Sequence, residues 1–116
     1  MPFVFLTEYP SEARPFYTMP SGKNDGLTNS FDLIMNGLEV TTSGQRIHDY
    51  DMLIAAMKKN NMNLDEFEGY LAAFKYGMPP HGGFGIGGER LTAKFLGLEN
   101  VRQASLFPRD RTRYSP

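Results

Sequence analysis

Residues 31–42 read FDLIMNGLEVTT, so that two apolar runs flank the dipeptide Asn36-Gly37. Asn and Gly tolerate positive φ better than other residues and suit the two central positions of a type I′ turn. The stretch therefore predicts a β-hairpin with one strand on each side of the dipeptide. Strand alternation across a two-residue turn places four side chains on one face of this hairpin: Asp32, Ile34, Glu39 and Thr41.

Downstream of the hairpin, apolar residues recur at helical spacing. The first such run begins at Gln45 and ends at Lys58-Lys59, whose charges suit the C-terminal end of a helix. Asn63 resembles an N-cap because Glu66 follows three residues later, and Gly77 closes the apolar stripe that follows. These patterns predict two helices.

Strand and helix signals also lie near both ends of the chain. Residues 82–90, GGFGIGGER, alternate small and apolar side chains, and Leu91, Phe95 and Leu96 follow at helical spacing, so this region predicts a strand, a glycine turn and a helix. The β-prone run Phe3–Leu6 predicts a buried strand, whereas residues 21–26 predict a mobile loop and residues 107–116 a basic, irregular tail. Together these elements predict an α+β fold, in which helices pack on one face of an antiparallel β-sheet.

The composition is that of one small globular domain over residues 1–116, with 41% apolar residues. A formal net charge of -1 gives no general attraction to a polyanion and argues against a dedicated nucleic-acid-binding module. The absence of cysteine excludes disulfides and cysteine catalysis and fits a reducing cytoplasm. No apolar stretch approaches the roughly 18 residues of a membrane span, so we expect a cytoplasmic protein with no membrane partner.

The glycine-rich segment is the first candidate for chemistry. Glycines let a backbone approach a ligand closely, and the N-terminus of the following helix offers free N–H groups to an anion. Arg90 lies in the first turn of that helix, and its planar guanidinium suits phosphate oxygens. A structural role remains the alternative, because glycine in a strand also permits close packing between strands. The segment is neither a Walker loop nor a dinucleotide fingerprint.

The hairpin face is the second candidate. Asp32 and Glu39 become diagonal neighbours, roughly 7–8 Å apart at Cβ, a span that a hydrated Mg²⁺ with nucleotide phosphates can bridge. Two projecting carboxylates repel each other unless a cation joins them, so the alternative is a simply solvated face. Residues 41–46, TTSGQR, add hydroxyls and a guanidinium, although Thr42 or Ser43 would also serve as a cap for the next helix.

The two histidines are too few and too far apart to indicate a transition-metal site. We expect His48 on a helix surface and His81 in a Pro-Gly loop. No Ser-His-Asp order with a nucleophile elbow is present, which argues against covalent serine catalysis.

Taken together, these elements resemble the catalytic core of class II aminoacyl-tRNA synthetases of the aspartyl, asparaginyl and lysyl subgroup, especially its archaeal-type aspartyl members. Residues 83–90, GFGIGGER, are similar to the third signature motif of that subgroup. Five other segments resemble the family in the same order along the chain: 14–17, 30–33, 37–46, 76–83 and 106–110. The resemblance covers nearly all of the chain and implies the C-terminal part of a catalytic domain.

This resemblance implies a site for ATP with Mg²⁺. Asp32 and Glu39 resemble the pair that coordinates Mg²⁺ on ATP, and Arg90 resembles the catalytic arginine that holds the terminal phosphate. Three further residues are expected to line the ATP site: Gly87, Gly88 and Glu89.

The resemblance also implies a site for an amino acid. Arg14 and Tyr17 match a loop that closes over the amino acid, and Thr42 stands where the family has a nearby hydroxyl. Arg46 would bind the side-chain carboxylate of L-aspartate or the amide oxygen of L-asparagine. A bidentate guanidinium prefers a carboxylate, which favours aspartate and leaves asparagine open.

The implied reaction activates an amino acid as its adenylate and then esterifies tRNA, as an aspartate– or asparagine–tRNA ligase does. The 116 residues contain no counterpart of the first and second signature motifs or of the anticodon-binding domain. We therefore expect an incomplete catalytic domain, because the second motif supplies the arginine that holds the α-phosphate. Whether the 116-residue chain is active in isolation stays open. We expect tRNA to bind to a longer parent protein.

Three further expectations complete the hypothesis. A non-catalytic paralogue that binds ATP or an amino acid is one alternative function. A ligase of the same fold that resembles asparagine synthetase and needs no tRNA is the other. An unpaired strand edge also predicts self-association, as in a homodimer.

Overall fold

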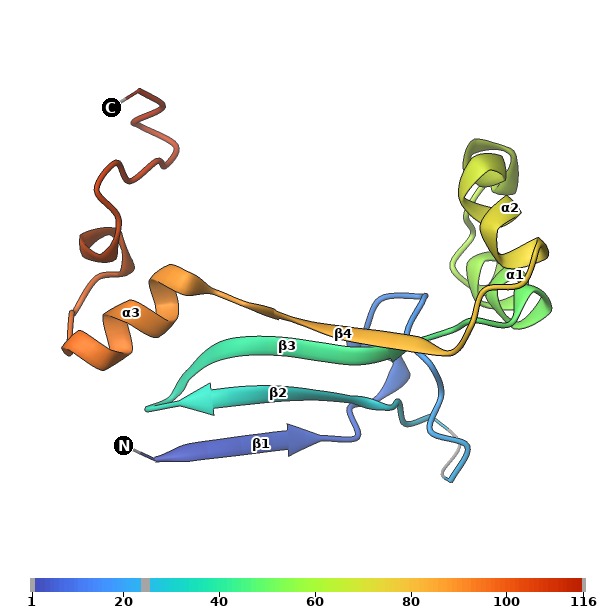
Figure 1. Ribbon diagram of the computed structural model, residues 1–116, viewed down its shortest axis with the longest axis horizontal. Coiled ribbons are helices and arrows are strands. Elements are labelled where there is room, and N and C mark those ends of the chain that lie inside the picture. The colour runs from blue at the N-terminus through green and yellow to red at the C-terminus, as the bar shows by residue number, and fades with distance from the viewer. Residues whose placement is uncertain (1, 24–25, 116) are drawn as a thin grey trace. The chain divides into compact units, whose positions relative to one another are not determined.

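The computed structural model describes residues 2–23 and 26–115 (Figure 1). Its four strands are β1 (Phe3–Thr7), β2 (Ser30–Met35), β3 (Leu38–Arg46) and β4 (His81–Ile86). Its three α-helices are α1 (Tyr50–Lys59), α2 (Glu68–Lys75) and α3 (Gly88–Leu96). Short 3-10 helices lie at Ser11–Ala13, Leu64–Phe67 and Val101–Ala104.

The strands form one antiparallel sheet in the order β1-β2-β3-β4. The predicted α+β class, with an antiparallel sheet and helices, is confirmed. The chain divides into two compact units. Unit 1 takes its residues from segments 1–6, 32–42 and 85–116, and unit 2 from segments 7–31 and 43–84.

The hairpin and α3 organise unit 1. Asn36 and Gly37 have φ values of 47° and 75°, as a type I′ turn requires, and the predicted hairpin is confirmed. The amide of Gly87, which precedes α3, donates to the carbonyl of Val40 at 2.9 Å. Farther along α3, Lys94 donates to the carbonyl of Asn36 at 3.1 Å. These bonds tie both ends of the helix to the hairpin.

Two helices and the end of β3 enclose the apolar core of unit 2. Its buried members are Ile47, Leu53, Met57, Leu71 and Phe74. The second helical stripe is confirmed as α2, preceded by the 3-10 turn that Asn63 caps and followed by Gly77 at a φ of 108°. The helical stripe therefore supplies a core, as apolar spacing of this kind usually does.

The prediction that the first helix begins near Gln45 is wrong. Strand β3 continues through Arg46 because residues 17–19 pair with it: Met19 donates to the carbonyl of Gln45 at 2.9 Å, and Ile47 donates to Tyr17 at 2.8 Å. Helix α1 starts at Tyr50 instead. The cap predicted from Thr42 or Ser43 is also wrong, because the side chain of Asp49 accepts from the amide of Met52 at 2.8 Å.

Three smaller expectations also differ from the structure. His48 lies between β3 and α1 and not on a helix surface, whereas His81 begins β4 and does not lie in a loop. Phe3–Leu6 does form a strand, but these residues are 44–61% exposed and not buried, and β1 is the first strand in the order of the sheet. In the predicted loop at 21–26, residues 24–25 lie outside the described part.

The described part of the tail, residues 107–115, contains no helix or strand, only turns and a single bridge between Asp110 and Arg113. This confirms the irregular terminus. Among the described residues, no helix is long and apolar enough to cross a membrane.

Candidate functional site

The first turn of α3 brings a guanidinium to the hairpin. Arg90 Nη1 donates to the backbone carbonyl of Glu39 at 2.9 Å and lies 3.6 Å from its carboxylate. Both side chains are roughly half exposed, so the ion pair is screened and either partner can turn to a ligand. Within unit 1, the structure thus brings together a predicted phosphate-binding residue and a predicted metal ligand.

Gly87 leaves room for the stem of Arg90 beside the start of α3. A Cβ atom at Gly87 would lie 3.3 Å from Cδ of Arg90, tighter than ordinary contacts, so its absence lets the stem of Arg90 fold back across the start of the helix. Gly88 and Glu89 are exposed in the same first turn. A carboxylate there is favoured by the helix dipole, and the free N–H groups remain available to an anion.

The carboxylate of Glu39 has a second contact. The hydroxyl of Thr42 donates to its Oε1 atom at 2.6 Å, a short bond typical of a charged acceptor. Thr42 was expected beside the amino acid; the structure brings its hydroxyl to Glu39, within unit 1. It therefore orients the carboxylate that the hairpin presents.

Asp32 completes the carboxylate pair on the same hairpin. The two-residue turn sets Asp32 opposite Thr41, and these two residues are 5% and 6% exposed. Glu39 shares their face and is more exposed. Within the described residues no group of three or more metal-ligating side chains occurs, but two carboxylates fit Mg²⁺, which retains water and phosphate oxygens as its other ligands.

Unit 2 holds three of the four residues predicted to bind the amino acid, namely Arg14, Tyr17 and Arg46. The guanidinium carbon of Arg46 lies 4.1 Å from the ring centre of Tyr17, within cation–π distance. Neighbouring residues hold this pair: Thr18 bridges to Arg46, and Phe16 packs its ring edge-on against Tyr17 at 5.3 Å. Tyr17 and Arg46 are therefore brought together, both half-buried.

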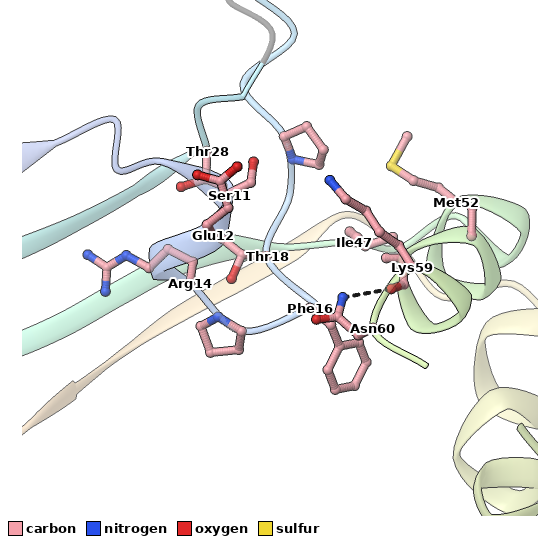
Figure 2. Close-up of a pocket in the computed structure, with 14 residues that line it drawn as sticks. Ser11, Glu12, Arg14, Phe16, Thr18, Thr28, Ile47, Met52, Lys59 and Asn60 are labelled. Carbon is pink, nitrogen blue, oxygen red and sulfur yellow. Dashed lines mark hydrogen bonds between the residues drawn. The ribbon is translucent and has the colours of Figure 1, made fainter. Parts of the chain in front are cut away.

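Arg14 has a different aromatic partner. Its guanidinium carbon lies 3.8 Å from the ring centre of Tyr9. Its stem borders a cavity of about 390 Å³ that lies between residues 11–20 and α1, and Figure 2 shows the guanidinium pointing away from that helix. Tyr9 was not among the predicted site residues, because nothing in the sequence links two side chains whose contact depends on how the loop folds.

The sequence analysis missed one further contact near Arg46. The side-chain amide of Asn29 donates to Oε1 of Gln45 at 2.9 Å, and the amide of Gln45 donates to the carbonyl of Asn29 at 2.8 Å. The residue before Arg46 is thus fixed through both its side chain and its backbone. Local spacing gives no signal for such a pair, which joins residues 16 apart.

Comparison with known proteins shows the family of the chain. Residues 1–111 match the family model described as class II tRNA synthetases (D, K and N). The chain belongs to this family. It is 58% identical, over 98% of its length, to the aspartate–tRNA(Asp/Asn) ligase of Thermus thermophilus, of which it covers 26%. It is 54% identical, again over 98% of its length, to the aspartate–tRNA(Asp) ligase of Thermoplasma volcanium, of which it covers 27%.

Solved synthetase structures share the fold. An aspartyl-tRNA synthetase from Entamoeba histolytica matches 98% of this chain, with 24% of its own length covered, at a TM-score of 0.93 and 39% identity. The asparaginyl-tRNA synthetase of the same organism, in complex with asparaginyl-adenylate, matches 98% of the chain and 27% of its own length, at a TM-score of 0.91 and 38% identity. The class II synthetase chain thus spans about a quarter of the length of its curated relatives.

Proposed function

We propose that this chain forms the C-terminal portion of the catalytic domain of an aspartate–tRNA ligase, with ATP, Mg²⁺, L-aspartate and tRNA as its ligands. The observation that carries the proposal is the geometry of Arg90, whose guanidinium contacts both the backbone and the carboxylate of Glu39. A guanidinium and a carboxylate held side by side offer one group for a phosphate and one for the cation that accompanies it.

The proposed chemistry assigns a distinct task to each residue. An oxygen of the aspartate α-carboxylate bonds to the α-phosphorus of ATP, and the bond from that phosphorus to the bridging oxygen of pyrophosphate breaks. Arg90 holds the terminal phosphate and offsets the charge that the leaving pyrophosphate acquires. The ATP site around Arg90 is lined by Gly87, Gly88 and Glu89. Asp32 and Glu39 would hold Mg²⁺, which would supply positive charge to the phosphate oxygens.

The choice of aspartate follows from Arg46. A guanidinium binds a carboxylate through two parallel charged hydrogen bonds, whereas an amide oxygen accepts without a charge of its own. The curated relatives at 58% and 54% identity are named as aspartate ligases, which supports the same choice. Asparagine is the second candidate, because a structural relative at 38% identity was solved with asparaginyl-adenylate.

Further parts of the proposal extend to the whole parent protein. The names of the relatives support tRNA(Asp) or tRNA(Asp/Asn) as the acceptor. The absence of cysteine supports a reducing compartment such as the cytoplasm. The first and second signature motifs and the anticodon-binding domain would belong to the remainder of the parent protein.

Titration calorimetry of ATP with Mg²⁺, with and without aspartate, tests the proposal. Saturable binding is expected, and Arg90→Ala should weaken it by roughly 10- to 100-fold, since a charged hydrogen bond contributes about 1.5–3 kcal/mol. Arg111→Ala is the matched control, because Arg111 is an exposed arginine outside the proposed site.

Activity of the longer protein separates the remaining alternatives. Aspartate-dependent pyrophosphate exchange followed by charging of tRNA supports the ligase. ATP binding without exchange would instead identify a non-catalytic paralogue. Conversion of aspartate and ammonia to asparagine without tRNA would identify a ligase resembling asparagine synthetase.

A further inference from the structure

We propose that Tyr17 is a positioning residue that acts through Arg46, and that its ring sets the selectivity for a side-chain carboxylate. The inference rests on the proposed function, in which Arg46 reads the side chain of the amino acid. It assigns Tyr17 a different role from that of a mobile loop residue that closes over the substrate.

The backbone around Tyr17 is held in place by hydrogen bonds. The carbonyl of Tyr17 accepts from the amide of Ile47 at 2.8 Å, and the amide of Met19 donates to Gln45 at 2.9 Å. Thr18 donates its amide to Pro15 at 3.0 Å and is 9% exposed. A segment paired on both sides of Tyr17 is a fixed platform for the end of β3.

The ring of Tyr17 holds the guanidinium without using any of its hydrogen-bond donors. The guanidinium carbon lies 4.1 Å from the ring centre, and a cation–π contact leaves the N–H groups free. Within the described part of the chain, no carboxylate lies within 4.0 Å of Arg46. Its donors are therefore available in a preset direction, and a preset arginine loses less entropy when it binds a carboxylate.

Removing the hydroxyl of Tyr17 distinguishes the proposed role of its ring from a direct contact between the hydroxyl and the substrate. Among the described residues, this hydroxyl has no hydrogen-bond partner. If the ring alone positions Arg46, then Tyr17→Phe preserves the function. If the hydroxyl contacts the amino acid, Tyr17→Phe loses it. The two variants Tyr17→Phe and Tyr17→Leu therefore distinguish an aromatic platform from a polar contact.

The experiment measures aspartate-dependent pyrophosphate exchange in the protein at its full natural length. Tyr17→Leu should raise KM for aspartate by roughly 3- to 30-fold, the range that a cation–π contact provides. It should leave kcat and KM for ATP close to wild type and reduce the preference for aspartate over asparagine. Tyr17→Phe should keep the wild-type KM for aspartate and the wild-type preference for aspartate. Tyr114→Leu, which removes a 75% exposed ring from the tail, is the control for a general loss of an aromatic side chain.

Each outcome separates the inference from the proposed function. Equal loss in Tyr17→Phe and Tyr17→Leu overturns the platform and assigns the hydroxyl to the substrate. A wild-type KM in Tyr17→Leu overturns it as well. A parallel fall in kcat and in affinity for ATP would show only a structural role for the ring. If the wild-type protein activates neither amino acid, the proposed function itself is wrong, and the selectivity inference fails with it.

Discussion

At the scale of single residues, the hydroxyl of Thr42 fixes the carboxylate of Glu39 with a bond of 2.6 Å. Replacing Thr42 with the isosteric Val removes that donor and frees the carboxylate to rotate away from the proposed Mg²⁺ site. We expect ATP binding in the presence of Mg²⁺ to weaken by roughly 3- to 10-fold, the effect of one hydrogen bond at a partly exposed site. Calorimetry over a range of Mg²⁺ concentrations measures it, with Thr42→Ser as the control that keeps the hydroxyl. Equal affinities in the two variants would contradict this role.

Asp110 provides a second residue-scale prediction, in the tail. The hydroxyl of Thr112 donates to its carboxylate at 2.7 Å and is the main reason that its pKa is lowered below 3.8, followed by the amide of Thr112 and the charge of Arg102. A lowered folded-state pKa stabilises the tail above the unfolded pKa and loses that effect as the pH falls through the folded value, below about pH 4. NMR titration of Thr112→Val should show the pKa rising towards 3.8, whereas Thr112→Ser should keep it low.

At the scale of elements, the contact between β3 and β4 depends on one glycine. A Cβ atom at Gly82 would lie 2.9 Å from the carbonyl oxygen of Gly44 and 3.1 Å from Cα of Gln45, and both are backbone atoms that cannot turn aside. Gly82→Ala should therefore lower the free energy of unfolding by about 1–3 kcal/mol. The matched variant Gly83→Ala meets nothing within 4 Å and should be tolerated. Urea denaturation of both variants tests the difference, and equal midpoints would refute it.

The same elements show what could be predicted from the sequence. The hairpin was predictable because Asn36-Gly37 encodes its turn locally. The sequence of a strand, a glycine turn and a helix was also predictable, because Gly87 and α3 follow one another along the chain. The extension of β3 through Arg46 was not, since its partners lie near residues 17–19 and 29. The platform under Arg46 and the hydroxyl beside Glu39 were missed for related reasons, because both are side-chain contacts that appear only in the folded chain.

At the scale of the whole molecule, the two compact units carry different sets of the residues assigned under the proposed function. Unit 1 carries the residues assigned to phosphate and metal, with Arg90 and Glu39 in contact, whereas unit 2 carries Arg46 and Tyr17. Each pair lies within one unit and is held there by backbone hydrogen bonds. ATP binding and amino-acid selectivity should consequently respond to different substitutions, as the Arg90 and Tyr17 variants are designed to show.

The exposed strand β1 leads to a prediction about the chain in isolation. Phe3, Val4, Phe5 and Leu6 are 44–61% exposed, and β1 is the first strand in the order of the sheet. An apolar strand at the edge of a sheet can pair with a strand of a second copy, whereas a lysine on such a strand opposes pairing. We expect the 116-residue chain to self-associate as its concentration rises, and Val4→Lys to shift it towards the monomer. Sedimentation velocity measures both, with Thr92→Lys on the exposed side of α3 as a control for added charge. A wild-type chain that stays monomeric at every concentration would show that this edge is protected without a partner.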